Sequence, residues 1–218
     1  MSSEETARQL TNAIVKGDSL ATEDLAKRLA ERKSSVTQAL DAIVNAMNIV
    51  NDLHSIGEYD HSRVSASSSA TLAALQVFEP QLSVEESKAI GTVVLGCIPE
   101  DSVSFDRAIA SSVLRAAGLK TLSLPTTVTY ENLTNIANQN QCDLVVLLIK
   151  THENDPRVQS LALEMRESLL KKALKILVGG NPQAARICQK YGFMNYFSDL
   201  GDLVSKVTEI VIKERKSC

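Results

Sequence analysis

The 218-residue chain carries 23 Lys and Arg against 26 Asp and Glu, a formal net charge of −3, and 44% of its residues are hydrophobic. This composition is that of a globular protein with a sizeable core. It excludes wholesale disorder, and the mildly acidic balance argues against nucleic-acid binding. Apolar runs such as 144–149 fall far short of the roughly 20 residues that a membrane span requires, so we expect a cytoplasmic protein with no role at a membrane.

The first part of the chain, residues 1–88, has the hydrophobic spacing of helices and no strand pattern. We expect four helices, at about 4–16, 21–32, 35–56 and 62–81. Residues 65–70, in the fourth of them, are almost all Ser and Ala. Such small side chains let helices approach closely or leave room for a ligand between them. We therefore predict a helical bundle domain over residues 1–88.

From Gly91 onward, short apolar runs typical of strands alternate with amphipathic stretches typical of helices. The strands are expected at 92–98, 120–124, 143–149, 175–178 and 194–197, and the helices at 104–117, 129–138, 156–172, 182–191 and 200–213. This alternation predicts an α/β domain over residues 89–218, with a five-stranded parallel sheet in flavodoxin-like order. Ligands of such sheets bind at the carboxyl ends of the strands, so a site should draw on the loops after the first, third and fourth strands.

Short motifs in both parts of the chain are similar to those of a known family. Gly57-Glu58-Tyr59 lies between the third and fourth helices, Asp143 opens the third strand, and Gly179-Gly180 follows the fourth. A helical bundle and a flavodoxin-like domain with these motifs resemble the corrinoid proteins of methyltransferase systems, modules that bind cobalamin. The resemblance covers nearly the whole chain. It implies that Gly179 and Gly180 receive the nucleotide tail of cobalamin and that Tyr59 and His61 face the ligand from above.

The chain departs from that family at the positions that give cobalamin its chemistry. In the family motif Asp-x-His-x-x-Gly, Asp101 is kept, Val103 replaces the cobalt-binding His, and Asp106 replaces the Gly. In the family's Ser-x-Leu, Leu148 stands at the Ser position and Lys150 at the Leu position. A hydrocarbon side chain cannot ligate a metal, and Leu148 would leave a buried ring nitrogen unpaired at a cost of about 1–3 kcal/mol. We therefore predict that cobalamin is not bound in the family's manner, with its base displaced by a protein His.

The three histidines suggest two other sites, and each site has a simpler structural explanation. His54, Glu58 and His61 recur at helical spacing and could bind a transition metal, but Gly57 should end the helix between them, which favours solvated residues at a helix end. His152 lies in the loop after the third strand, where it is either a replacement axial ligand or an ordinary surface residue.

Two loops at the strand ends also carry candidate chemistry. The acidic loop with Glu100, Asp101 and Asp106 resembles the phosphoryl-accepting region of a receiver domain, but the third strand lacks the Asp that such a domain needs at its end. Gly179-Gly180 before a helix could cradle a phosphate, or could simply form a tight turn between strand and helix.

Three functions follow from these observations. The dismantled ligand motif favours a non-enzymatic corrinoid-fold protein that acts as a sensor, regulator or partner-docking module, with no certain cofactor. The first alternative is a tetrapyrrole-binding protein that takes base-attached cobalamin, haem or a bilin. The second is a corrinoid carrier subunit of a methyltransferase system. We expect a protein partner, methyltransferase-like or regulatory, and allow for a homodimer; no catalytic residue and no metal ligand is assigned.

Overall fold

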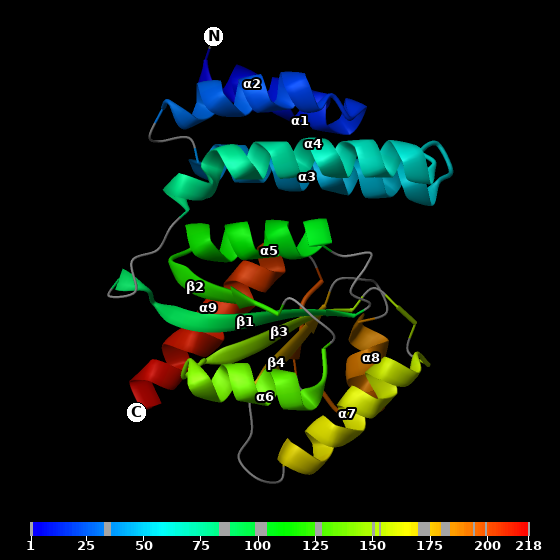
Figure 1. The fold of residues 1–218 in the computed structure, drawn as a ribbon, viewed down its shortest axis with the longest axis vertical. Coiled ribbons are helices and arrows are strands. Elements are labelled where there is room, and N and C mark those ends of the chain that lie inside the picture. Colours follow the sequence, from blue (N-terminus) through cyan, green and yellow to red (C-terminus); the bar gives the residue numbers. More distant parts are fainter. Residues whose placement is uncertain are drawn as a thin grey trace. The chain divides into compact units, whose positions relative to one another are not determined.

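The computed structural model describes residues 2–32, 36–82, 88–98, 104–124, 128–149, 151–152, 154–169, 175–179, 184–193, 195–198 and 200–217. The chain forms two compact units, Met1–Ser83 and Val84–Cys218. Figure 1 shows the first as a group of helices and the second as a sheet with helices packed on it. No helix within the described ranges is both long and apolar enough to cross a membrane.

The N-terminal unit consists of the four predicted helices. They are α1 (Ser3–Lys16), α2 (Ser19–Ala30), α3 (Val36–Ser55) and α4 (His61–Phe78), and a 3-10 turn, η1 (Glu79–Gln81), follows them. Three of the helices begin at a residue whose side chain accepts a hydrogen bond from a backbone N–H of the first turn, namely Ser2, Asp18 and Asp60. Such caps satisfy backbone donors that have no partner within the helix.

The small side chains of α4 permit a close approach to the end of α1. Gly17, at the C-terminus of α1, has a φ of 73°, and a Cβ added there would lie 2.7 Å from the Cβ of Ala66. The Ser67 hydroxyl is buried and donates to the Val15 carbonyl at 3.1 Å. The first of the two readings of this Ser/Ala stretch, close helix packing, is therefore what the structure shows at this point.

The C-terminal unit has the predicted alternation. Its elements are β1 (Gly91–Ile98), α5 (Ser104–Ala116), β2 (Leu119–Ser123), α6 (Tyr130–Gln139), β3 (Leu144–Ile149), α7 (Pro156–Leu169), β4 (Ile176–Gly179), α8 (Ala184–Tyr191), β5 (Asn195–Tyr196) and α9 (Leu200–Ser217). The strand order is β2-β1-β3-β4-β5, and every pair is parallel. The predicted α/β class and flavodoxin-like order are confirmed.

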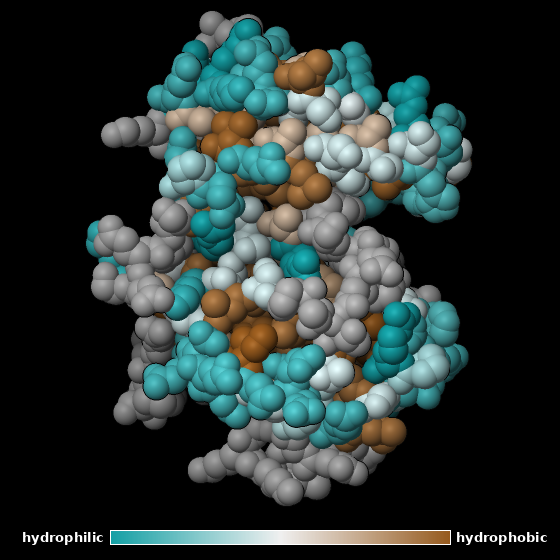
Figure 2. Space-filling model, in the orientation of Figure 1, coloured by the Kyte–Doolittle hydropathy of each residue, from teal (hydrophilic) through white to brown (hydrophobic). Residues whose placement is uncertain are grey.

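Helices cover both faces of the sheet, and each face has its own core. The side chains of α5 and α9 pack on one face, and those of α6, α7 and α8 pack on the other (Figure 1). The two central strands, β1 and β3, are apolar almost throughout because they are buried from both sides. Hydrophilic residues cover much of the face seen in Figure 2, and hydrophobic residues show between them.

None of the cysteines that the structure describes, Cys97, Cys142 and Cys188, is in a disulfide. Cys97 and Cys188 are buried and Cys142 is half-buried. Burial raises the pKa of the Cys142 thiol and of the Cys188 thiol to about 11. Cys97 and Cys188 are thus small core side chains.

Candidate functional site

The predicted site lies at the edge of the sheet where β1, β3 and β4 end. The register pairs Cys97 with Leu148 and Leu148 with Gly179, so the last residues of the three strands lie side by side. The loops that leave this edge are largely outside the described residues. The predictions made for Asp101, Val103, Lys150 and Gly180 fall there, whereas those for Asp106, Leu148 and Gly179 can be located.

Leu148 and Asp106 occupy two different environments at this edge. Leu148, near the end of β3, is 2% exposed and belongs to the apolar cluster between the sheet and the helices α5 and α9. A leucine in this cluster offers no hydrogen bond to a ligand. Asp106 is half-buried in the first turn of α5, where the helix dipole favours a carboxylate.

An aromatic ring packs directly against the end of β4. A Cβ built on Gly179 would lie 2.3–2.4 Å from three ring carbons of Phe197, which is closer than real Cβ contacts come. Phe197 follows β5 and is 2% exposed. Its backbone N–H donates to the Val178 carbonyl at 2.9 Å, which fixes the residue beside β4. Gly179 is thus required by packing within the chain itself.

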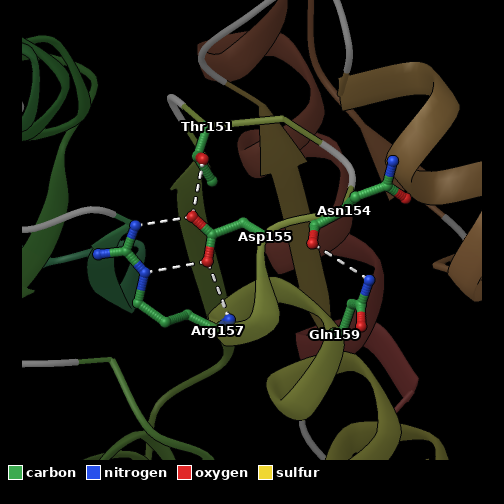
Figure 3. Close-up of polar contacts among 5 residues, drawn as sticks. All are labelled: Thr151, Asn154, Asp155, Arg157 and Gln159. Atoms are coloured by element: carbon green, nitrogen blue, oxygen red, sulfur yellow. Dashed lines mark hydrogen bonds and ion pairs between the residues drawn. The ribbon is translucent and has the colours of Figure 1, made fainter.

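The described part of the loop after β3 holds an ion pair between Asp155 and Arg157. Asp155, which precedes α7, is 6% exposed. Figure 3 shows its carboxylate receiving hydrogen bonds from Thr151 and Arg157: Thr151 Oγ1 donates to Oδ2 at 2.8 Å, Arg157 Nη2 donates to Oδ2 at 2.7 Å, and Arg157 Nε donates to Oδ1 at 3.0 Å. The backbone N–H of Arg157 also donates to Oδ1, at 2.9 Å, so the same side chain caps α7.

These contacts make Asp155 a structural residue. The Arg157 guanidinium holds the pKa of the Asp155 carboxyl well below its usual range, and the Thr151 hydroxyl acts in the same direction. A carboxylate so firmly ionised and so fully hydrogen-bonded is a poor general base. The next turn is anchored as well, because Gln159 Nε2 donates to the Asn154 carbonyl at 3.2 Å (Figure 3). His152, in the same loop, is exposed.

In the N-terminal unit, Tyr59 is engaged within the unit. Its hydroxyl donates to the Val15 carbonyl at 3.0 Å, and its own carbonyl lies 2.8 Å from Nδ1 of His54. The Arg63 guanidinium lies over the Tyr59 ring, 5.8 Å from its centre. The side chain that the resemblance places above a ligand therefore ties the start of α4 to the end of α1.

His61 and His54 come together at the turn between α3 and α4. The centres of their exposed rings are 5.1 Å apart. Glu58 does not complete a three-residue group with them, because no cluster of three or more His, Cys, Asp or Glu suited to a metal occurs among the described residues. The hypothesis of a two-His, one-carboxylate metal site is thus not supported by the described part of the chain.

Two residues of this edge, Asp155 and Phe197, were not among the predicted site residues. Asp155 could have been found, because a polar residue followed by Pro156 is a typical start of a helix. Phe197 lies in a weak strand signal, and nothing local indicates that its ring reaches Gly179, 18 residues earlier in the chain.

Comparison with known proteins agrees with this architecture. Residues 6–79, which take in most of α1 and all of α2 to α4, match the family model described as the B12 binding domain. Dimethylamine corrinoid protein 1 of Methanosarcina mazei is 26% identical over 218 residues, which cover 97% of this chain and 98% of that protein. The chain is similar to corrinoid proteins over nearly its whole length. The resemblance predicted from the sequence is confirmed.

Two solved structures share the fold. The monomethylamine corrinoid protein of Methanosarcina barkeri is 20% identical, with a TM-score of 0.74, and the match covers 96% of this chain and 100% of that one. A chain of the methanol:cobalamin methyltransferase complex from Methanosarcina barkeri is 17% identical, with a TM-score of 0.52 over 95% of this chain and 80% of that one. At these identities the likeness establishes the fold alone.

The described residues of the edge do not fit a corrinoid whose nucleotide tail is inserted beside the sheet. Leu148 offers no polar partner to the base, and the space next to Gly179 holds the ring of Phe197. A corrinoid that keeps its base attached to its own cobalt requires neither of these positions. The described residues of this edge therefore fit a base-attached corrinoid better than one with an inserted tail.

Proposed function

We propose that this protein is a corrinoid carrier subunit of a methyltransferase system, and that it holds a corrinoid with its base attached instead of inserted in the sheet. The observation that supports this proposal is the similarity to a corrinoid protein over 97% of this chain, which spans both units. A protein that used only the α/β fold for another purpose would not need to keep the helical unit as well. Val103, where the family has its cobalt-binding His, excludes ligation by that residue.

The partner under this proposal is a methyltransferase. One of the structures that share the fold is a chain of a methanol:cobalamin methyltransferase complex, which supports a carrier that works against a second protein. Asp155, at the start of α7, and Tyr59, in the helical unit, both have structural roles, and we expect the protein itself not to catalyse a reaction. Its part is to bind and present the corrinoid.

A second candidate, a corrinoid-free sensor or partner-docking module, is favoured by one specific observation. The apolar contact between Phe197 and Gly179 fills, with the protein's own side chain, a place that the resemblance gives to the ligand. A protein that no longer binds any corrinoid would show the same contact.

Binding of hydroxocobalamin separates the two candidates. The purified protein is incubated with excess hydroxocobalamin and passed over a gel-filtration column, and the corrinoid that co-elutes is measured from its visible absorption. A carrier retains about one corrinoid per chain, in a base-attached spectrum at neutral pH. No co-elution, with no shift on titration with haem or a bilin either, would contradict the carrier and support the corrinoid-free module. Val103→His should change the spectrum only if the base can leave cobalt.

A further inference from the structure

The contact between Gly179 and Phe197 is the tightest approach of a side chain to a glycine at the candidate edge. Three ring carbons of Phe197, Cε1, Cζ and Cε2, lie 2.3, 2.3 and 2.4 Å from the place of a Gly179 Cβ. The ring therefore lies in the space that any other residue's side chain would take. Since β4 ends at Gly179, this space is at the carboxyl end of the strand, where ligands of such sheets bind.

The surroundings of the ring are apolar. Leu148, the register partner of Gly179, and Cys97, the register partner of Leu148, are 2% and 3% exposed. Both share a cluster with Phe197 and with Leu203 and Val207 of α9. The ring thus belongs to a buried and largely apolar cluster, in which Leu148, Leu203 and Val207 offer no hydrogen bond to a ligand.

The position of Phe197 is set by the backbone as well as by packing. Its N–H continues the hydrogen bonding between β5 and β4 by donating to Val178. The side chains of successive strand residues point to opposite faces of a sheet. The same register that places exposed Tyr196 therefore turns Phe197 toward the α5 and α9 face. The backbone of β5 thus directs the Phe197 side chain to this face of the sheet.

We infer that Phe197 is a built-in plug that closes the place beside Gly179 and so determines which corrinoids the protein can bind: those whose tail stays outside the sheet. This inference deepens the proposed function and rests on it for the identity of the ligand, but the closed space itself is a property of the chain alone. With the plug in place, the nucleotide tail contributes nothing to affinity.

The first test uses the tail's base alone, 5,6-dimethylbenzimidazole, and needs no cobalt. Engineered cavities of about 150 Å³ lined by Leu, Ile and Phe bind benzene, so removal of a buried ring can create an aromatic site. We expect Phe197→Ala to bind the base, which should raise the melting temperature of this variant and shift protein resonances in its NMR spectra. The wild type should not bind the base. Phe193→Ala is the matched control, because Phe193 is a buried ring in the core of the opposite face.

The outcomes of this first test are decisive in both directions. Binding by Phe197→Ala alone supports the plug. Equal binding by the wild type, or by Phe193→Ala, would overturn it, as would a folded Phe197→Ala that binds no base. If Phe197→Ala does not fold, Phe197→Leu, which removes less of the ring's volume, takes its place, with circular dichroism as the check on folding.

The second test compares two corrinoids on the unaltered protein. Cobinamide lacks the nucleotide tail that hydroxocobalamin carries. With the space closed, cobinamide should bind as tightly as hydroxocobalamin, within about threefold, because the tail makes no contact that adds to affinity. A tenfold or larger preference for hydroxocobalamin would show that the tail is received and would overturn the inference. If neither corrinoid binds, the proposed function fails, and the test with the base alone still decides whether Phe197 is a plug.

Discussion

The helical unit and the carboxyl edge of the sheet differ in which residues of the corrinoid resemblance are kept and in what those residues contact. In the helical unit Tyr59 is kept, and its hydroxyl is used within the unit, on the Val15 carbonyl. At the edge of the sheet Leu148 stands where the resemblance places a Ser, and it is buried among apolar side chains. Gly179 is kept there too, but the ring of Phe197 packs against it.

This difference teaches that a retained motif is weak evidence for a ligand when the residue also has a structural task. Tyr59 and Gly179 are each explained by contacts within the chain, so neither by itself predicts cobalamin. The changed positions are more informative, because the resemblance implies that the same fold can hold a Ser in place of Leu148 and a His in place of Val103. Substitutions of the two retained residues, and of Asp155 beside the same edge, test whether these residues are held by structure.

The largest effect is expected from Gly179→Ala. The new methyl group would lie about 2.3 Å from the Phe197 ring, so the ring and strand must move, and overpacking of this kind destabilises by about 1–3 kcal/mol or more. Hydrogen-exchange mass spectrometry should show faster exchange in β3 and β4 and unchanged exchange in α1 to α4. In a Phe197→Ala background the same substitution should cost clearly less, since the clashing ring is gone. Equal costs in the two backgrounds would mean that the contact does not constrain Gly179.

Asp155→Asn should have the next largest effect, about 2 kcal/mol at neutral pH, because it weakens charge-assisted hydrogen bonds to a buried group. The pKa of Asp155 is lowered in the folded protein, so its contribution is complete above the unfolded-state pKa of about 3.9 and is lost as the pH falls through the folded-state value. The stability difference between wild type and variant should therefore be constant from pH 7 to 5 and shrink below pH 4.

Asp24→Asn provides the control for that measurement. Asp24 pairs with Arg28 on the exposed surface of α2, at 2.7 Å, with both side chains more than half exposed. An exposed pair of this kind contributes about 0.5 kcal/mol or less. A loss of similar size for Asp155→Asn and Asp24→Asn would contradict the structural role given to Asp155.

The smallest effect is expected from Tyr59→Phe, about 1 kcal/mol, since one hydrogen bond is lost while Ser67 still donates to the same Val15 carbonyl. Exchange should accelerate at the α1–α2 turn and the start of α4. Corrinoid affinity, measured by titration, should not change if Tyr59 acts only within its unit. A tenfold or larger fall in affinity without a change in exchange would place Tyr59 against the ligand instead.

The fold could be predicted closely because its signals are local. The helices follow from the helical spacing of apolar residues. The parallel sheet follows from the apolar runs that became β1 and β3 and from their alternation with amphipathic stretches. None of these signals needs information from distant residues. The ends of the helices are predicted less accurately. The second helix begins at Ser19, two residues before the predicted start, because Asp18 caps it.

The site could be predicted only as a location. The loops after β1, β3 and β4 do leave one edge, as a parallel sheet requires. What fills that edge depends on contacts between distant residues: Phe197 meets Gly179 only after β5 joins the sheet, and no spacing rule in the sequence carries that information. The Arg157 fork on Asp155 likewise depends on how the side chain turns back at the start of α7.

The thiols of Cys142 and Cys188 offer a way to measure local opening of the C-terminal unit. Because burial raises the pKa of Cys142 and Cys188 to about 11, both thiols are almost entirely protonated at pH 7, so alkylating reagents should modify them chiefly when the surrounding structure opens. Once Cys218, outside the described residues, is replaced by Ser, the rate of alkylation of the remaining thiols reports how often the sheet's helices part. Comparing that rate with and without a bound corrinoid would then reveal whether the ligand steadies the scaffold.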